Sequence, residues 1–207
     1  MGRWNEFINE FNKVRGRLNI TEPEIFLILY HAFKRGSISR YFISDKLKIG
    51  DSTARGVLKR LCKLGYMHPI RSGHKLTSKG IELIRYYAER IDIFDSIDIP
   101  IKVDKVNIIF IARRASEGVS RGIEERDNVV KFSGSGAITM ICKDGKIYFP
   151  DSGEEIDNWY PKLSKRLIED LNVEDNDVII VSGASEYSSA LKGGIYAVLK
   201  LLERCLE

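Results

Sequence analysis

Cysteine and histidine, the side chains that most often bind metal ions, are scarce in this sequence. Its 207 residues include three histidines and three cysteines, and Cys62, Cys142 and Cys205 lie far apart in no CxxC pair. An odd number of widely spaced cysteines argues against both a disulfide framework and a zinc site. We therefore expect neither a metal nor a cofactor.

Long apolar segments are also missing. Although 43% of the residues are hydrophobic, no apolar run approaches the roughly 20 residues that a membrane-spanning helix needs. The beginning of the chain, MGRWNEFINEFNKVRGR, lacks the apolar core of a secretory signal. We expect a globular, cytoplasmic protein that binds no membrane and has one large domain or two small ones.

Catalytic patterns are absent as well. No histidine follows His74, no nucleophile elbow is present, and no spacing singles out a carboxylate pair among the 18 Asp and Glu of residues 101–207. General acid-base catalysis needs such positioned titratable groups. We therefore predict that the protein is not an enzyme.

The whole chain has a net charge of +4, and its positive charge is concentrated in the first half. Residues 1–100 carry 18 Lys and Arg against 11 Asp and Glu, whereas residues 101–207 carry 15 against 18. Within the first half, residues 34–79 hold twelve basic side chains against only Asp45 and Asp51, a local excess of +10. Such a block favours a polyanionic partner, and a solvated lysine-rich surface is the alternative.

Helical and extended patterns alternate between residues 20 and 92. A capping-box pattern, Thr21 followed by Glu24, opens a helix that ends at Gly36. In residues 51–64 apolar residues recur every three or four positions, which predicts an amphipathic helix with a basic opposite side. The expected order is a helix over 24–36, a helix over 39–47, a turn over 48–51, the amphipathic helix, strands at 66–70 and 74–77, and a helix from Thr77 to about Phe94.

This order resembles the winged helix-turn-helix family over residues 20–92. The segments that carry the resemblance are SRYFISDKL-KIG-DSTARGVLKRLCKLGYM for the helix-turn-helix, HPIRSGHK for the wing, and LTSKG before the last helix. The resemblance implies a recognition helix in the major groove of double-stranded DNA, with the preceding helix and the wing on the backbone. A winged helix used for protein contacts is the alternative.

The geometry of that family suggests which residues would bind DNA. Arg55 is the best candidate for a guanine edge, because its forked side chain matches O6 and N7. Gly56 either lets the phosphate backbone approach or relieves crowding. Basic residues around the recognition helix and wing would neutralise phosphates. The predicted DNA-binding residues are Arg40, Lys48, Ser52, Thr53, Arg55, Gly56, Lys59, Lys63, Arg71, His74 and Lys75.

An apolar stripe precedes the predicted winged domain. Phe7, Phe11, Val14 and Leu18 are spaced as one face of a helix within residues 1–19, and such a face must be covered. It either packs on its own domain or pairs with its copy in a second subunit. Since DNA-binding proteins of this type often place two recognition helices in successive major grooves, we expect a homodimer.

The second half predicts a different arrangement. Residues 93–103 contain Pro100 and no helical stripe, and we expect a linker there. The apolar runs KVNIIFIA, AITMIC, KIYF and DVIIVSG predict strands, KDGK carries the Asp-Gly of a hairpin turn, and helical patterns lie between and after them. The fold class is therefore α+β, with residues 104–207 forming a two-layer α+β domain that senses an effector or supports dimerisation.

Serines and glycines gather at junctions of this half, in FSGSGA and VSGASEYSSALKGG. A helix start that follows a strand favours an anion, and an arginine directly after the first strand could clamp an acidic ligand. The candidates for binding a small-molecule effector are Arg113, Ser133, Ser135, Ser182, Gly183, Ser185 and Ser188. Ordinary serine caps and glycine turns are the alternative, because neither stretch matches a phosphate-binding loop.

The whole layout is similar to an uncharacterised archaeal family that joins a winged-helix head to a C-terminal domain of unknown function. The stretch most similar to it is RGIEERDNVVKFSGSGAITMICKDGKIYFP, residues 121–150. The resemblance implies a regulatory role and supplies no catalytic residue. We predict a DNA-binding transcriptional regulator; the alternatives are an enzyme of unknown reaction with a DNA-binding head and a winged-helix adaptor for protein or RNA.

Overall fold

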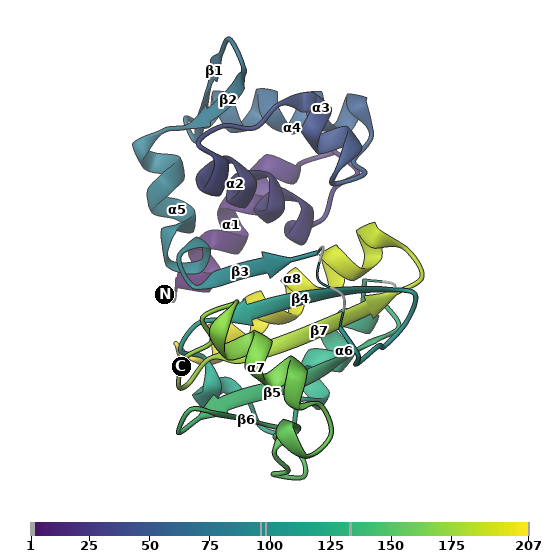
Figure 1. Ribbon diagram of the computed structural model, residues 1–207. Coiled ribbons are helices and arrows are strands. Elements are labelled where there is room, and N and C mark those ends of the chain that lie inside the picture. The colour runs from purple at the N-terminus through teal and green to yellow at the C-terminus, as the bar shows by residue number, and fades with distance from the viewer. Residues whose placement is uncertain (1–2, 96, 98, 133, 207) are drawn as a thin grey trace. The chain divides into compact units, whose positions relative to one another are not determined.

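The structure is a computed structural model that describes residues 3–95, 97, 99–132 and 134–206, apart from the side chains of residues 3–6. The chain is a mixed α/β protein with two antiparallel sheets, and it divides into two compact units, Met1–Glu89 and Arg90–Glu207 (Figure 1). None of the helices in these described ranges is long and apolar enough to cross a membrane.

The N-terminal unit has the order of elements that its sequence predicts. Thr21 donates its backbone N–H to Glu24 Oε2 at 2.8 Å where the second helix begins, and Gly36, with φ 78°, ends that helix. Thr77 Oγ1 accepts the Gly80 N–H at 3.1 Å where the last helix begins. The elements are α1 (Arg3–Arg15), α2 (Glu22–Arg35), α3 (Arg40–Asp45), α4 (Asp51–Lys63), β1 (Met67–Ile70), β2 (Gly73–Leu76) and α5 (Ser78–Ala88).

Aromatic side chains hold α1 within this unit. Phe7 and Phe11 are 1% and 0% exposed. The centroid of the Phe7 ring lies 5.8 Å from that of Phe26 in α2 and 5.1 Å from that of Tyr87 in α5. The apolar face of α1 is therefore covered inside a single chain, which corresponds to the packing alternative for residues 1–19.

The C-terminal unit is built on a five-stranded antiparallel sheet in the order β3-β4-β7-β5-β6. The strand β7 lies at its centre and pairs with both β4 and β5. The elements are β3 (Ile91–Phe94), β4 (Val106–Ala112), the 3-10 turn η1 (Ser116–Gly118), α6 (Ile123–Val130), β5 (Gly136–Lys143), β6 (Lys146–Tyr148), the 3-10 turn η2 (Ile156–Asn158), α7 (Pro161–Glu169), β7 (Val178–Ala184) and α8 (Tyr187–Arg204).

The boundary between the units differs from the prediction. The helix expected to reach about Phe94 ends at Ala88, and β3 follows it. Ile91 continues the apolar stripe of the helix in sequence, but it pairs with Ala112 because β4 satisfies the backbone groups of this segment. The linker predicted at residues 93–103 thus begins inside a strand.

Helices cover both faces of the sheet, so the predicted two-layer arrangement is corrected to three layers (Figure 1). On one face Ile109 and Ile111 of β4 share a buried cluster with Leu163 of α7. On the other face Phe110 contacts Gly194 of α8, which packs against α6. Because β4 and β7 are buried on both sides, their sequences are mostly apolar rather than alternating, apart from Asn107 in β4 and Ser182 in β7.

Replacing Gly194 by alanine should destabilise the protein. A Cβ atom at this position would lie 2.0 Å from Cε2 of the Phe110 ring, so the helix or the ring would have to move. We expect the free energy of unfolding to fall by about 1–3 kcal/mol, the usual effect of overpacking a core. Urea unfolding followed by circular dichroism measures the change. Ser189→Ala in the same helix is the control because it adds no heavy atom, and equal stability of the two variants would contradict the prediction.

Candidate nucleic-acid interface

The turn between α3 and α4 is fixed by a cap, a backbone hydrogen bond and buried side chains. Ser39 Oγ accepts the Phe42 N–H at 3.1 Å and caps the start of α3. Ile43, Leu47 and Ile49 are 0%, 3% and 4% exposed, and the Ile49 N–H donates to the Ile43 carbonyl at 3.3 Å. These contacts hold the two helices as one unit.

The helix α4 has one buried face and one exposed face. Ala54, Val57 and Leu61 are completely buried, as their spacing predicts. Thr53 is half-buried at the border between the faces. The opposite side carries four exposed residues of the predicted DNA-binding set, Ser52, Arg55, Lys59 and Lys63.

A carboxylate stands between two of the predicted arginines. Asp51 is the first residue of α4, and its Oδ1 lies 2.8 Å from Nε of Arg40 in α3. Its Oδ2 lies 3.0 Å from Nη2 of Arg55, one turn further along α4. The side chains of Arg40, Asp51 and Arg55 are 50%, 53% and 68% exposed, so this arginine-aspartate cluster is open to solvent.

Other predicted phosphate contacts carry charge that the fold does not use. Lys59, Lys63, Arg71 and Lys75 are exposed, and none has an ion-pair partner within the described part of the chain. Lys48, in the turn before α4, lies 3.9 Å from an Asp45 oxygen. At least four cations of the predicted set are therefore available to an external anion.

Two half-buried residues of α4 contact the end of α1 and the chain that follows it. A Cβ atom on Gly56 would lie 2.8 Å from Cδ2 of Leu18, so this glycine relieves crowding and does not open the surface to a phosphate. Arg60, from the basic side of the predicted helix, donates Nη1 to the Val14 carbonyl at 3.0 Å and also to the Arg15 carbonyl. Both carbonyls lie in the last turn of α1, where backbone acceptors need donors, and the Arg15 carbonyl also accepts the Leu18 N–H at 2.8 Å. The Arg60 charge therefore serves the fold.

The hairpin of β1 and β2 is tied to the segment before α3. His74 in β2 exchanges two backbone hydrogen bonds with Ile38, each 2.8 Å long. The His74 ring is half-buried, and its Nδ1 is buried without a hydrogen-bond partner among the described residues. His74 is thus part of the hairpin packing rather than an exposed wing residue, whereas Lys75 beside it points to solvent.

Sequence reasoning missed two residues near this surface. Tyr41, next to Arg40 in α3, is 77% exposed. Lys79 donates Nζ to the carbonyl of Leu64, the residue that caps the end of α4, at 3.0 Å. Its Nζ also lies 4.4 Å from the centroid of the Tyr66 ring. Tyr41 is exposed because it lies two positions before the buried Ile43, and residues two apart do not share a helix face. Nothing in the spacing indicates the contacts of Lys79.

Among the predicted effector-binding residues, Arg113 is occupied by the fold. Its guanidinium lies 2.8 Å from an Asp92 oxygen and 2.7 Å from an Asp177 oxygen. It also donates to the backbone carbonyls of Asn172 at 2.6 Å and Leu171 at 3.2 Å. Arg113, directly after β4, therefore joins β3 to the residue before β7 rather than presenting its charge to a ligand.

Three further candidates also have structural partners. Ser182 is fully buried and donates Oγ to the Ala190 carbonyl at 2.8 Å. A Cβ atom on Gly183 would lie 2.3 Å from Cβ of Val103, so only glycine fits there. Ser135 donates Oγ to the Asp104 carboxylate, and this hydrogen bond lowers the pKa of Asp104.

The effector-binding candidates do not form one site. Arg113 follows the end of β4, at the end of the sheet where β7 begins, whereas Ser135 and Gly183 meet where β7 ends. Ser185 is exposed and Ser188 half-buried at the start of α8. Ser133 lies outside the described residues. The two ends of the sheet are separated by the length of β7.

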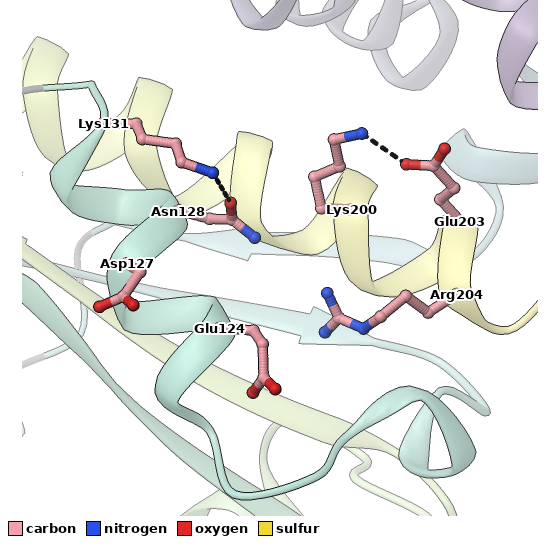
Figure 2. A pocket seen from close by; sticks show the side chains of 7 residues that line it. All are labelled: Glu124, Asp127, Asn128, Lys131, Lys200, Glu203 and Arg204. Carbon is pink, nitrogen blue, oxygen red and sulfur yellow. Dashed lines mark hydrogen bonds and ion pairs between the residues drawn. The ribbon is translucent and has the colours of Figure 1, made fainter.

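A polar groove between α6 and α8, with a volume of about 490 Å³, was not predicted (Figure 2). Lys200 pairs with Glu203 at 2.6 Å, and Lys131 donates to Asn128 at 3.0 Å. The groove is lined by Glu124, Asp127, Asn128, Lys131, Lys200, Glu203 and Arg204. Its three acidic and three basic side chains balance, so it has no excess charge that would attract an ionic ligand.

Beneath the groove lies a buried acid. Glu125 is fully buried, and Arg204 donates Nη2 to its Oε1. Burial raises the pKa of Glu125, although Arg204 opposes the shift. This pair joins α6 to the end of α8, and no spacing in the sequence distinguished it.

Comparisons with known proteins find a family similarity within the second unit, and the family is one of unknown function. A family described as "Domain of unknown function (DUF4443)" matches residues 103–201. The solved structure of the hypothetical protein PH0730 from Pyrococcus horikoshii OT3 is 25% identical, with a TM-score of 0.65, over 90% of this chain and 100% of that chain. No curated protein matches the chain. The expected similarity to an archaeal protein with a C-terminal domain of unknown function is confirmed to this extent.

His74 should make the stability of the protein depend on pH near neutrality. Burial lowers its pKa from the ordinary value of 6.5, so the unfolded chain takes up this proton at a higher pH than the folded protein. The contribution of His74 to stability is present above pH 6.5 and is lost as the pH falls below that value. We expect His74→Leu to reduce the difference in melting temperature between about pH 7.5 and about pH 5.5.

The control is His68→Leu, in the exposed strand of the same hairpin. It should keep the difference in melting temperature seen in the unsubstituted protein. A difference that persists unchanged in His74→Leu would contradict the prediction.

Proposed function

We propose that this protein is a DNA-binding transcriptional regulator in which residues 20–92 form a winged helix-turn-helix domain. The observation that carries the proposal is the exposed basic side of α4, opposite a completely buried apolar face. Two helices joined by a tight turn and followed by a hairpin and a further helix are the arrangement such domains use to present a recognition helix.

Available positive charge supports binding to the DNA backbone. Residues 34–79 carry an excess of +10, and Lys59, Lys63, Arg71 and Lys75 have no ion-pair partner in the described chain. Each cation that neutralises a phosphate releases condensed counterions, which gives affinity without reading the sequence. The proposal therefore predicts binding that weakens steeply with salt.

The position of Arg55 supports readout of bases. It lies in the second turn of α4, and recognition helices contact base edges mainly through their N-terminal residues. Only Nη2 of its guanidinium is hydrogen-bonded among the described residues, which leaves Nη1 and a second hydrogen of Nη2 for O6 and N7 of guanine. Arg55 would then select a guanine, while the surrounding lysines position the domain.

For the C-terminal unit we propose a regulatory role, with a homodimer as the DNA-binding form. A ligand can regulate binding only if its affinity differs between DNA-competent and incompetent states. Because Arg113, Ser135 and Ser182 have structural partners, these residues are not assigned to an effector.

Substituting Arg55 should test the proposal directly. The purified protein is first incubated with a pool of random DNA duplexes, and the retained DNA is sequenced. We expect enrichment of one motif, as an inverted repeat if two copies bind together. Arg55→Ala should weaken binding to the selected duplex by about 5- to 150-fold, since a bidentate arginine-guanine pair contributes about 1–3 kcal/mol.

The matched control is Arg126→Ala in the C-terminal unit. Arg126 is also an exposed arginine paired with an aspartate, Asp127 at 3.0 Å, so the change in net charge is the same. The affinity of the Arg126→Ala variant for the selected duplex should equal that of the unsubstituted protein. Absence of duplex binding even at low salt would contradict the proposal, and equal losses in the two variants would contradict base readout by Arg55.

A further inference from the structure

We infer that Asp51 is a specificity-determining residue of the proposed DNA interface: it holds Arg40 and Arg55 and opposes binding to DNA of the wrong sequence. The inference rests on the proposed function. It starts from the arginine-aspartate cluster, in which one carboxylate meets an arginine from α3 and an arginine from α4.

The cluster restricts the side chain that would read a base. An exposed arginine has many rotamers, and a guanine contact needs both terminal nitrogens of the guanidinium in one plane with the base edge. The 3.0 Å contact between Asp51 Oδ2 and Arg55 Nη2 limits these rotamers while leaving other donors available. Asp51 would therefore preorganise Arg55 for readout.

The same carboxylate disfavours contacts that carry no sequence information. The N-terminus of a helix and nearby arginines ordinarily attract phosphates. At the start of α4 this region is occupied by Asp51, whose two oxygens partly neutralise Arg40 and Arg55. A phosphate that approaches must displace the arginines from Asp51 and come close to its negative charge. Asp51 therefore weakens non-specific binding more than specific binding, because in the specific complex the contact between Arg55 and a guanine compensates for the repulsion.

Removal of the charge is compatible with folding. Both ion pairs are exposed, and exposed pairs contribute little to stability. The apolar face of α4 would still hold the helix, because Ala54, Val57 and Leu61 are completely buried. Effects of Asp51→Asn on DNA binding can thus be separated from unfolding by comparing melting temperatures.

The test measures two affinities for each protein as a function of salt: one for the duplex selected by the unsubstituted protein and one for a scrambled duplex of equal length and composition. For Asp51→Asn we expect affinity for the scrambled duplex to rise about 3- to 10-fold at about 0.1 M salt, with a salt dependence steeper by about 1 to 2 in log-log slope. Affinity for the selected duplex should rise less, so that the ratio of the two affinities falls.

Asp45→Asn provides the matched control. Asp45 lies in α3, its side chain is 40% exposed and also pairs with basic residues, and its replacement changes the net charge equally, but it contacts Lys46 and Lys48 rather than Arg40 or Arg55. Its ratio of affinities should stay close to that of the unsubstituted protein.

The outcomes separate this inference from the proposed function. A fall in the ratio for Asp51→Asn but not for Asp45→Asn supports the role of Asp51. Equal ratios in both variants, with normal duplex binding by the unsubstituted protein, overturn it and leave the proposed function standing. If the unsubstituted protein binds neither duplex, the proposed function fails and the inference fails with it.

Discussion

Burial of one face of α4 is the interaction on which the proposed interface depends. Ala54, Val57 and Leu61 are completely buried, and burying a side chain such as valine or leucine contributes about 1.5–3 kcal/mol. An exposed ion pair contributes about 0–1 kcal/mol, so packing rather than charge decides how the helix is oriented. Once the apolar stripe is buried, helix geometry leaves Arg55 and Lys59 on the outside. Exposure of the basic side is thus a consequence of the core.

Basic side chains in this protein fall into two groups, and only one can serve a partner. Arg60 satisfies carbonyls at the end of α1, and Arg113 is held by two carboxylates and two carbonyls. To bind a ligand, either residue would have to give up these contacts, and the loss is costly where the partner is buried, as the Asp177 carboxylate is. Lys59 and Lys63 make no ion pair or hydrogen bond through their side chains within the described residues. A count of charges in the sequence therefore overstates the surface available to DNA.

The sequence predicted what depends on neighbouring residues and missed what depends on distant ones. The capping pair of Thr21 and Glu24 acts over three positions, so its pattern can be recognised directly. The partners of Arg113, in contrast, lie 21 and 64 positions away. The strand β3 also depends on a distant partner, because it forms by pairing with β4. The third layer does so too, because α7 packs on residues of the sheet that no local pattern indicates. The serine and glycine clusters likewise suggested a ligand site, but Ser182 and Gly183 make tertiary contacts within the fold.

The arrangement on α4 also separates affinity from specificity in physical terms. Lysines such as Lys59 and Lys63 attract any phosphate backbone, and more of them would tighten every complex alike. Discrimination requires that a wrong sequence leave a cost uncompensated. A carboxylate placed between arginines supplies such a cost, because a phosphate must displace the arginines from Asp51, whereas a matching base can bind Arg55 while the contact with Asp51 is kept. An acidic residue at the centre of a basic surface is therefore consistent with selective binding to a polyanion, and not only with weaker binding.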